Sequence, residues 1–274
     1  MVNSLHKTLF VFDIETIPDL VAAANLVGAN DDLHQLKEAL VNYHLEVTGG
    51  RNAFLRQPFH KVVAISFLEA EIIHSNGQEF YSLKKIKSGG QIHSDEKEIV
   101  KGFFQYLAGI YPRLVSFNGK TFDLPVLKYR AMLHGVQAKW LYQSGDKWNN
   151  YNTKYNLDWH CDLIDALSDF GSSARVKMNE VCAILNFPGK LETDGSMVET
   201  MYNDGLLKEI RDYCEIDVIN SYLLYIRYNH HTGRISKESY NKMIDDLISF
   251  LEHERTNHFT IFLEEWRKIG IQYL

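Results

Sequence analysis

The chain has 274 residues, a formal net charge of −6, 45% hydrophobic residues and 23% charged residues. This balance is typical of a globular protein and argues against one that coats nucleic acid through bulk positive charge. Three cysteines without C-x-x-C spacing predict neither a disulfide framework nor a zinc site. No apolar run approaches the roughly 18 residues of a membrane span. We therefore expect a soluble, cytoplasmic protein with no membrane partner.

The first predicted element is a strand that carries two acids. The apolar run "LFVF" leads into Asp13, and Glu15 follows two positions later. Strand side chains alternate between the two faces of a sheet, so both carboxylates point the same way. Two like charges ~4 Å apart repel by about 4 kcal/mol at an effective dielectric of 20. A bound divalent cation would offset this repulsion, and a solvated strand end is the alternative.

The segment after this strand, residues 19–60, is long for a loop. Within it, Leu33, Leu36 and Leu40 recur at helical spacing. This spacing predicts a helical insertion after the first strand.

The elements that follow alternate in type. Two β-rich runs cover residues 61–70 and 72–83, and Asn76-Gly77 in the second is a turn signal. Next come a helix N-capped by Ser94, a strand at "LVSFNG", a helix at "LPVLKYRAMLHG" and a fifth strand at "WHCDLIDAL". The order predicts an α/β fold, a mixed five-stranded sheet with helices on both faces.

The C-terminal part, residues 236–269, is predicted to be a long amphipathic helix. Its apolar residues lie at helical spacing: Ile244, Leu247, Ile248, Leu251, Phe259, Phe262, Leu263 and Trp266. The stripe predicts packing on the core, and a homo-oligomer seam or a surface for a partner in trans is the alternative. Because no Pro/Gly/Ser linker divides the chain, we expect a single domain over 1–274, with a core of about 8–229 and a helical extension over 230–274.

A second acidic motif is "SFNGKTFDLPVL", residues 116–127, which ends a strand and opens a helix. Asn118-Gly119 is predicted to form the turn, and Pro125 suits a first helical turn. Asp123 lies near the helix start, where exposed N–H groups favour an anion, so a capping role is the alternative to a catalytic one.

A third motif, "IRDYCEIDVINSYLLYIRY", is predicted to be a largely buried helix. Tyr213 and Asp217 are four residues apart and share one face. An aspartate in such a helix is unfavourable unless it is paired or bound to metal. A Tyr–Asp hydrogen bond within the core is the alternative to a ligand role.

Residues 139–160 interleave aromatic residues with Lys139, Lys147 and Lys154. Such a pattern suits single-stranded nucleic acid, although a loop anchored by its own aromatic side chains is the more usual structure.

The group His160, Asp162 and Asp165 resembles a metal-ligand cluster, but without a third element we expect hydrogen-bonded structure. Lys177 and Lys190 are expected to be solvated.

Taken in order, these motifs resemble the DEDD exonucleases, which are 3′-to-5′ exonucleases on a ribonuclease H-like fold. The Tyr-x-x-x-Asp spacing resembles the tyrosine subclass; the sister subclass has histidine where this chain has Asp212. "DIET" and "FNGKTFDLPVL" look most like a bacterial family of predicted stand-alone exonucleases related to the proofreading domain of family-B DNA polymerases. The resemblance runs from about residue 8 to 229.

The resemblance implies removal of nucleotides from the 3′ end of single-stranded DNA by two-metal-ion hydrolysis. It implies two divalent cations, Mg²⁺ or Mn²⁺, held by Asp13, Glu15, Asp123 and Asp217. Tyr213 would orient the attacking water. The residues that flank the acids and are expected to contact the terminal nucleotide are Thr16, Asn118 and Phe122, although turn chemistry explains Asn118 equally well.

Three alternatives stay open at this point. RNA in place of DNA keeps the same chemistry, and the sequence does not show whether the pocket accepts a 2′-OH. A non-catalytic nucleic-acid-binding module is disfavoured because clustered carboxylates repel phosphate. An endonuclease of the same broad fold is disfavoured by the Tyr-x-x-x-Asp motif. No polymerase-sized region follows the motifs, so any proofreading is expected to act in trans.

Overall fold

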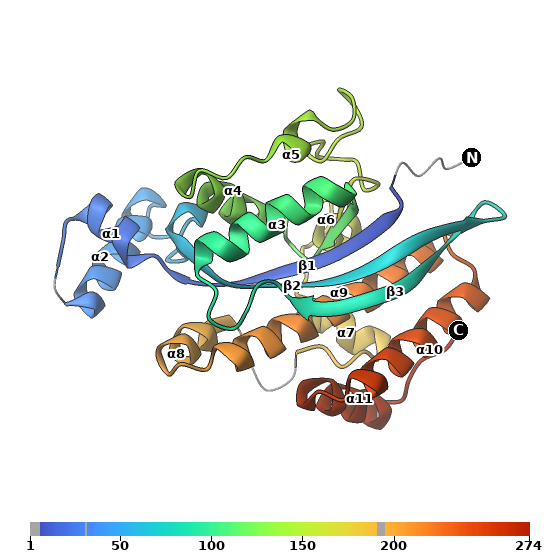
Figure 1. Ribbon diagram of the computed structural model, residues 1–274. Coiled ribbons are helices and arrows are strands. Elements are labelled where there is room, and N and C mark those ends of the chain that lie inside the picture. The colour runs from blue at the N-terminus through green and yellow to red at the C-terminus, as the bar shows by residue number, and fades with distance from the viewer. Residues whose placement is uncertain (1–5, 31, 191–194) are drawn as a thin grey trace.

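A computed structural model of the chain describes residues 6–30, 32–190 and 195–274. Its strands form one sheet in the order β3-β2-β1-β4-β5 (Figure 1). β2 is antiparallel to β1 and β3, whereas β1, β4 and β5 are parallel to one another. This confirms the expected mixed five-stranded, ribonuclease H-like α/β sheet. The strands are β1 Thr8–Pro18, β2 His60–Ser75, β3 Gln78–Ser88, β4 Arg113–Ser116 and β5 His160–Asp162.

Helices cover both faces of the sheet (Figure 1). α3, α4 and α5 pack on one face, and α6, α7, α9, α10 and α11 pack on the other. None of the described helices combines the length and apolarity that a membrane-spanning segment requires. The helices are α1 Leu20–Val27, α2 Leu33–Val47, α3 Glu96–Ile110, α4 Asp123–Leu133, α5 Lys139–Gln143, α6 Leu163–Leu167, α7 Met178–Leu185, α8 Val198–Asn203, α9 Leu207–His231, α10 Lys237–Glu254 and α11 Asn257–Ile269.

The alternation of β1 assigns its side chains to two cores. Phe10, Phe12 and Ile14 pack against α3 and α4. Leu9 and Val11 belong to the core that contains α9. Asp13 and Glu15 continue the odd-numbered series. The two acids therefore point to the side of the sheet that α9 covers.

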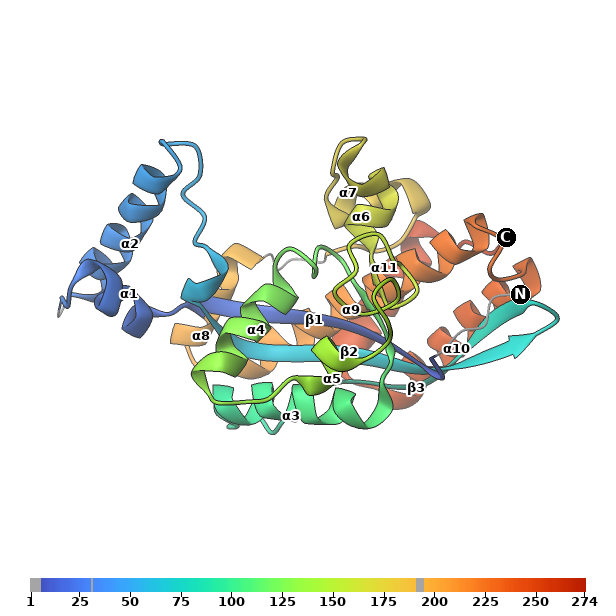
Figure 2. The ribbon, with the colours of Figure 1, turned by 90° about the horizontal axis from the view of Figure 1, so that it is seen from above.

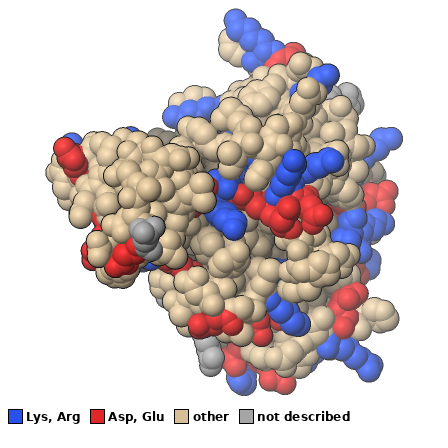
Figure 3. All heavy atoms as spheres, turned by 60° about the vertical axis from the view of Figure 1, so that its left-hand side comes forward, with Lys and Arg blue, Asp and Glu red and all other residues tan. Residues whose placement is uncertain are grey.

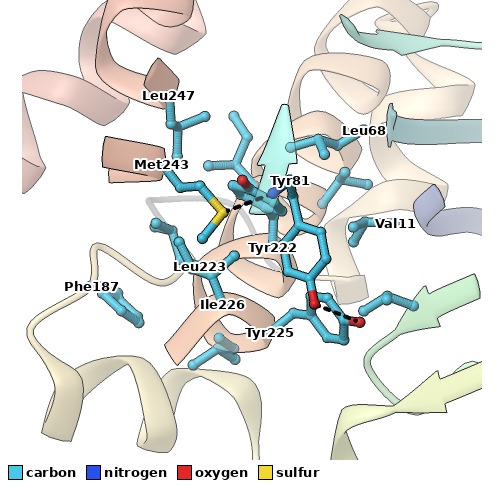
Figure 4. Packing of buried hydrophobic residues seen from close by; sticks show 14 of the residues in the cluster. Val11, Leu68, Tyr81, Phe187, Tyr222, Leu223, Tyr225, Ile226, Met243 and Leu247 are labelled. Carbon is cyan, nitrogen blue, oxygen red and sulfur yellow. Dashed lines mark hydrogen bonds between the residues drawn. The ribbon is translucent and has the colours of Figure 1, made fainter. Parts of the chain in front are cut away.

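The core between the sheet and α9 encloses a network of bonded polar groups. The Tyr81 N–H donates to Met243 Sδ at 3.3 Å, and the Tyr81 hydroxyl lies 3.5 Å from that of Tyr225 (Figure 4). The Tyr81 hydroxyl also donates to Glu79 at 2.7 Å. The fully buried Arg113 donates to both oxygens of Glu79, at 2.6 and 2.9 Å, and to the Tyr225 hydroxyl at 3.1 Å. This network joins β3 and β4 to α9.

The β2–β3 hairpin corrects the predicted strand boundaries. Asn76 and Gly77 have φ of 52° and 77°, which suits a two-residue hairpin turn. β2 runs unbroken to Ser75, because β3 pairs with it along its whole second half. The predicted break between residues 70 and 72 was therefore wrong, whereas the turn is confirmed.

The start of α3 corrects the predicted cap. Asp95 rather than Ser94 is the N-cap: its carboxylate accepts the Glu98 N–H at 2.8 Å, and Glu98 accepts the Asp95 N–H at 3.3 Å. The Ser94 hydroxyl accepts the Gln91 N–H in the preceding turn instead. A carboxylate followed by Glu at N3 completes a capping box that serine one residue earlier cannot form.

The fifth strand is shorter than predicted. β5 ends at Asp162, whose carboxylate accepts the Ile164 N–H at 3.1 Å and caps α6. The apolar residues after Asp162 therefore belong to a helix. Sequence periodicity alone does not separate so short a strand from the start of a helix.

The C-terminal segment is two helices rather than one, because Arg255 adopts a left-handed conformation (φ 52°) and ends α10. The apolar stripe packs inside the chain: all its members except Ile248 are buried, and Ile248 is partly buried against the same core. The predicted packing on the core is confirmed, so this stripe is not a free seam for a second protein.

The insertion forms a lobe of two helices, α1 and α2, N-capped by Asp19 and Asp32. It projects from the end of β1 (Figure 2) and presents a mostly uncharged surface at the left of Figure 3. Leu36 and Leu40 are buried between its elements, as the spacing predicted. Leu33, the first residue of α2, is 61% exposed, so only two of the three leucines at helical spacing are buried in this lobe.

Candidate active site

β1 contributes the first two carboxylates of the site. Asp13 lies opposite Ser66 and Glu15 opposite Ala64 on β2, and the register shifts immediately after Glu15. Such a bulge bends the strand and changes the direction of the next side chain. Glu15 is 8% exposed, and Asp13 is half-buried beside it.

A tight turn after β4 positions the third acid. Asn118 has φ of 71°, and a Cβ added to Gly119 would lie 2.4 Å from Ser116 Oγ, so only glycine fits there. Asp162 of β5 accepts the N–H groups of Asn118 and Lys120, both at 2.8 Å. The backbone of the turn is therefore held by the Asp162 carboxylate of the neighbouring strand.

Asp123 is the first residue of α4 and is 3% exposed. Its Oδ1 accepts the N–H of Ile14 at 3.2 Å, the residue between the two acids of β1. Burial, with a further contribution from the charge of Asp162, raises the pKa of Asp123 to about 7. The Asp123 carboxylate is thus bonded to β1, the central strand that carries Asp13 and Glu15, which is more than a capping role requires.

α9 contributes the fourth acid and the tyrosine. Asp217 and Tyr213 lie one turn apart on the buried face of α9, and Asp217 Oδ1 is buried without a hydrogen-bond partner among the described residues. Lys190 Nζ lies 2.9 Å from Asp217 Oδ2 and also donates to the Tyr213 hydroxyl. The expectation that Lys190 is simply solvated was therefore wrong, because the segment after α7 brings it against α9.

Cys214 joins the acids of β1. Single donor atoms of Asp13, Glu15 and Cys214 lie within 4.8 Å of one another, and the Cys214 thiol lies 3.7 Å from Asp13 Oδ2. Burial raises the pKa of Cys214 well above its usual range, and the charges of Asp13 and Glu15 act in the same direction. The sulfur is therefore a neutral thiol that donates to Asp13.

The acids raise one another's pKa, because each negative charge disfavours ionisation of its neighbours. Burial, followed by the charges of the other acids, raises the pKa of Asp13 and of Glu15 well above the ordinary range. Burial also raises the pKa of Asp217, although Lys190 opposes this rise. Burial lowers the pKa of Lys190, but the Asp217 carboxylate outweighs that effect and raises it overall. One ammonium group thus partly balances four carboxyl groups.

The residues present fit a divalent cation. Among the described residues, donor atoms of Asp13, Glu15 and Cys214 lie within 4.8 Å of one another, and Asp123 and Asp217 lie outside this group but raise the pKa of Asp13. Asp217 Oδ1 is a buried acceptor that the described part of the protein leaves unsatisfied. Hard cations such as Mg²⁺ and Mn²⁺ prefer oxygen ligands of this kind. The site can therefore hold a divalent metal.

The expected substrate contacts divide into two places. Thr16 Oγ1 lies 2.9 Å from His60 Nδ1, and the Phe122 ring packs edge-on against His60 at 4.9 Å. Phe54 from the insertion, 61% exposed, packs against both rings. Asn118 instead lies at the turn and takes the left-handed conformation that the turn requires at this position.

The remaining sequence candidates are structural. His160 Nε2 lies 2.7 Å from Ser116 Oγ, Asp162 caps backbone groups, and Asp165 pairs with Arg175 at 2.7 Å. Hydrogen-bonded structure was the expectation for this group, and it is confirmed.

Sequence reasoning missed four neighbours of the site: Lys190, Cys214, Phe54 and His60. Only Cys214 carried a usable signal, because it lies three residues before Asp217 on a helix and so shares its face. The other three come from segments whose positions depend on tertiary packing.

Comparisons with known proteins find a matching family and similar sequences. The profile of a family described as "Predicted 3'-5' exonuclease related to the exonuclease domain of PolB" matches residues 52–266. Two catalytic subunits of DNA polymerase epsilon are also similar, one from Kluyveromyces lactis and one from Candida glabrata. Each is 22% identical, over 77% and 82% of this chain respectively. The chain spans about a tenth (10%) of the length of these relatives.

A solved structure is also similar. The family B DNA polymerase from the hyperthermophilic archaeon Pyrobaculum calidifontis matches 89% of this chain and 29% of its own chain, with a TM-score of 0.44 and 14% identity.

Proposed function

Because the chain belongs to the family of predicted 3′-5′ exonucleases related to the exonuclease domain of PolB, we propose that it removes nucleotides from the 3′ ends of single-stranded DNA. The proposed reaction is phosphodiester hydrolysis with two divalent cations, Mg²⁺ or Mn²⁺. We further propose that residues 1–274 act as one domain.

One observation supports the proposal: carboxylates from three separate elements lie close enough to raise one another's pKa and that of Tyr213. Asp13 and Glu15 come from β1, and Asp123 accepts the Ile14 N–H from the start of α4. Asp217, on α9, raises the pKa of both acids of β1. A fold has no structural reason to bury four acids together without enough positive charge. The unsatisfied Asp217 Oδ1 points to a ligand that completes the group.

We assign the metal-ligand role to the four acids. Two divalent cations, when bound, would lower the pKa of an attacking water and stabilise the departing 3′ oxygen. Asp13, with neighbours from both β1 and α9, is the acid best placed to serve both cations. Asp123 is held by the Ile14 N–H, so its second oxygen stays available.

Tyr213 is assigned the positioning of the water. Burial raises the pKa of Tyr213, and the charges of Asp217, Glu15 and Asp13 add to that rise, so the phenol keeps its proton. A neutral hydroxyl is both a donor and an acceptor and can orient a water without removing its proton. Tyr213 is 6% exposed, which limits the directions its hydroxyl can take.

The terminal nucleotide is assigned to the other side of the acids. Thr16 follows Glu15 directly and Phe122 precedes Asp123 directly, and His60 joins the two. The ring of Phe122 offers a face for a base, and Phe54 extends the aromatic surface. DNA is favoured over RNA because the named relatives are DNA polymerases.

The test uses a single-stranded DNA oligonucleotide labelled at its 5′ end and an RNA of the same sequence. Each is incubated with Mn²⁺, Mg²⁺ or EDTA, beside Asp13→Ala and the matched control Asp212→Asn. We expect a metal-dependent ladder that shortens from the 3′ end, absent with Asp13→Ala and present with Asp212→Asn. If the RNA is shortened faster than the DNA, the proposed substrate is RNA instead of DNA. Intact oligonucleotides under every metal, with binding retained, would indicate a non-catalytic binding module.

A further inference from the structure

Three aromatic side chains stand exposed on the segment between α4 and β5. Tyr142, Trp148 and Tyr155 are 60%, 71% and 66% exposed. Each has a lysine ammonium near its ring centroid: Lys128 at 5.4 Å, Lys147 at 4.8 Å and Lys154 at 5.2 Å. Single-stranded nucleic acids are bound by this combination, in which bases stack on rings and phosphates meet cations.

These rings are not the ones that hold the segment in place. Trp140, Tyr151 and Trp159 are buried, and Tyr151 packs edge-on against both tryptophans at 4.9 Å. The Tyr151 hydroxyl donates to the Pro112 carbonyl at 2.8 Å. The segment therefore contains one set of aromatic residues that anchors it and a second set that is mostly exposed. Within the second set, the Tyr155 ring also packs edge-on against Phe170 at 4.9 Å.

The charge on this surface is locally positive although the chain is acidic. The Asp146 carboxylate accepts the N–H groups of Trp148 and Asn149, and Asp158 pairs with Arg234 at 2.6 Å. Within the described residues, no carboxylate lies within ion-pair distance of Lys120, Lys128, Lys139, Lys147 or Lys154. Lysines that lack a carboxylate partner and lie beside exposed rings attract a polyanion.

Hydrogen bonds join this surface to the candidate active site. Lys120 Nζ donates to the Lys154 carbonyl at 3.1 Å, while its backbone N–H is held by Asp162 in the turn that precedes Asp123. On the other side, Lys128 of α4 donates to Asn152 at 3.2 Å. The segment that carries the exposed rings therefore lies beside the turn that leads to Asp123.

We propose that Tyr142, Trp148 and Tyr155, with their lysines, form a second binding site that holds the single-stranded nucleic acid upstream of the reacting 3′ end. The inference rests on the proposed function, since it names where the rest of that substrate lies. Because stacking on a ring is largely independent of base identity, this site supplies affinity and length dependence rather than sequence preference.

The first test measures binding in EDTA, where the strand stays uncut. Labelled dT15, U15 and an abasic 15-mer are titrated with the intact chain and with Tyr142→Ser, Trp148→Ser and Tyr155→Ser. We expect each substitution to weaken dT15 binding about tenfold. The abasic strand keeps its phosphates and loses its bases, so its affinity should be low and insensitive to the three changes. Tyr273→Ser, which removes an exposed ring far along the chain, is the control.

A second test separates charge from stacking and cleavage from binding. Lys147→Gln with Lys154→Gln should reduce the slope of log affinity against log salt by about 1.4, or 0.7 per phosphate contact. With Mn²⁺ and the wild-type protein, the KM for a 15-mer should be lower than the KM for a trimer. This difference in KM should be smaller for the serine variants. Affinities equal to wild type in all variants would overturn the inference, whereas absence of any cleavage by wild type would overturn the proposed function instead.

Discussion

Lys190 Nζ lies 2.9 Å from Asp217 Oδ2, so the chain places one of its own cations inside its group of acids. The same ammonium group donates to the Tyr213 hydroxyl and lies 4.9 Å from the centre of its ring. Lys190 therefore balances part of the charge that metal cations would balance. Metal binding and this ion pair should compete for Asp217.

The first prediction concerns that competition. Lys190→Met should lower the free energy of unfolding of the metal-free protein by about 1–2 kcal/mol, because a charged hydrogen bond is lost. Removal of a nearby positive charge should also tighten Mn²⁺ binding by about tenfold. Melting in EDTA and calorimetric titration with Mn²⁺ measure the two effects. Lys177→Met, an exposed lysine at the start of α7, is the control, and matching results for both variants would contradict the idea.

The second prediction concerns metal removal. Mg²⁺ or Mn²⁺ at about 100 times its Kd should stabilise the protein by about 2.7 kcal/mol, or roughly 5–10 °C in Tm, and EDTA should reverse this. Asp217→Asn should lose most of the response because it removes a ligand oxygen from the site. Asp212→Asn lies on the same helix and pairs with Lys208 outside the site, so its response should match wild type. Equal responses in both variants would exclude Asp217 as a ligand.

A third prediction tests the buried pair that joins β3 to β4. Glu79→Gln leaves the buried Arg113 charge without its carboxylate partner and should cost about 3–5 kcal/mol of folding free energy. The measurement is urea unfolding at neutral pH. Glu71→Gln breaks the exposed pair with Lys84 on the same hairpin and should cost at most about 1 kcal/mol. Similar losses for the two variants would show that burial does not govern this pair.

The fourth prediction follows from the pKa of Asp19. Burial alone would raise this pKa, but the Ala22 N–H and the Arg130 guanidinium outweigh burial and lower it below its ordinary value of 3.8. A lowered folded-state pKa means that the contribution to stability is present above pH 3.8 and is lost as the pH falls through the folded-state value.

Asp19→Asn should therefore destabilise the protein by about 1–3 kcal/mol at pH 7 and by progressively less below pH 4. Urea unfolding of both proteins between pH 3 and pH 8 gives the difference directly. Asp32→Asn, which changes the exposed N-cap of α2, should show a smaller difference at neutral pH. A difference for Asp19→Asn that does not change with pH would point to lost packing instead of lost charge.

The fifth prediction concerns thiol chemistry. Burial raises the pKa of Cys161 and of Cys182 to about 12, and it raises the pKa of Cys214 well above its usual range. Only the thiolate reacts readily with disulfide reagents, so the folded protein should be inert to them at pH 8. Titration should count no reactive thiol in buffer and three in concentrated urea. A thiol that reacts rapidly in the folded state would show that the packing around α9 opens easily.

The sequence predicted those features that repeat within one element. Alternation along β1 placed Asp13 and Glu15 on one face, and the four-residue spacing placed Tyr213 and Asp217 on one side of a helix. The turn at Asn76-Gly77 was also predictable, because few residues tolerate positive φ. Element ends were predicted less well: the cap of α3, the length of β5 and the break at Arg255 depend on competing local bonds of similar strength.

The identity of the acids as one group came from resemblance to a family, since spacing along the chain says nothing about distance between Asp123 and Asp217. Only the packing of α4 and α9 around β1 brings those two side chains close enough for the charge of Asp217 to raise the pKa of Asp123. Likewise, the aromatic residues of 139–160 could not be divided in advance into those that anchor the segment and those that stay exposed. Burial depends on which neighbours arrive from β4 and α5.

By itself, then, the sequence determined the class of fold, the elements that carry the acids and the face each acid occupies, because these follow from short-range periodicity. Tertiary structure alone decided that Lys190 pairs with Asp217, that Cys214 donates to Asp13 and that Phe54 reaches Phe122. These contacts join segments far apart in the chain. Their formation depends on long-range packing, which no local pattern encodes.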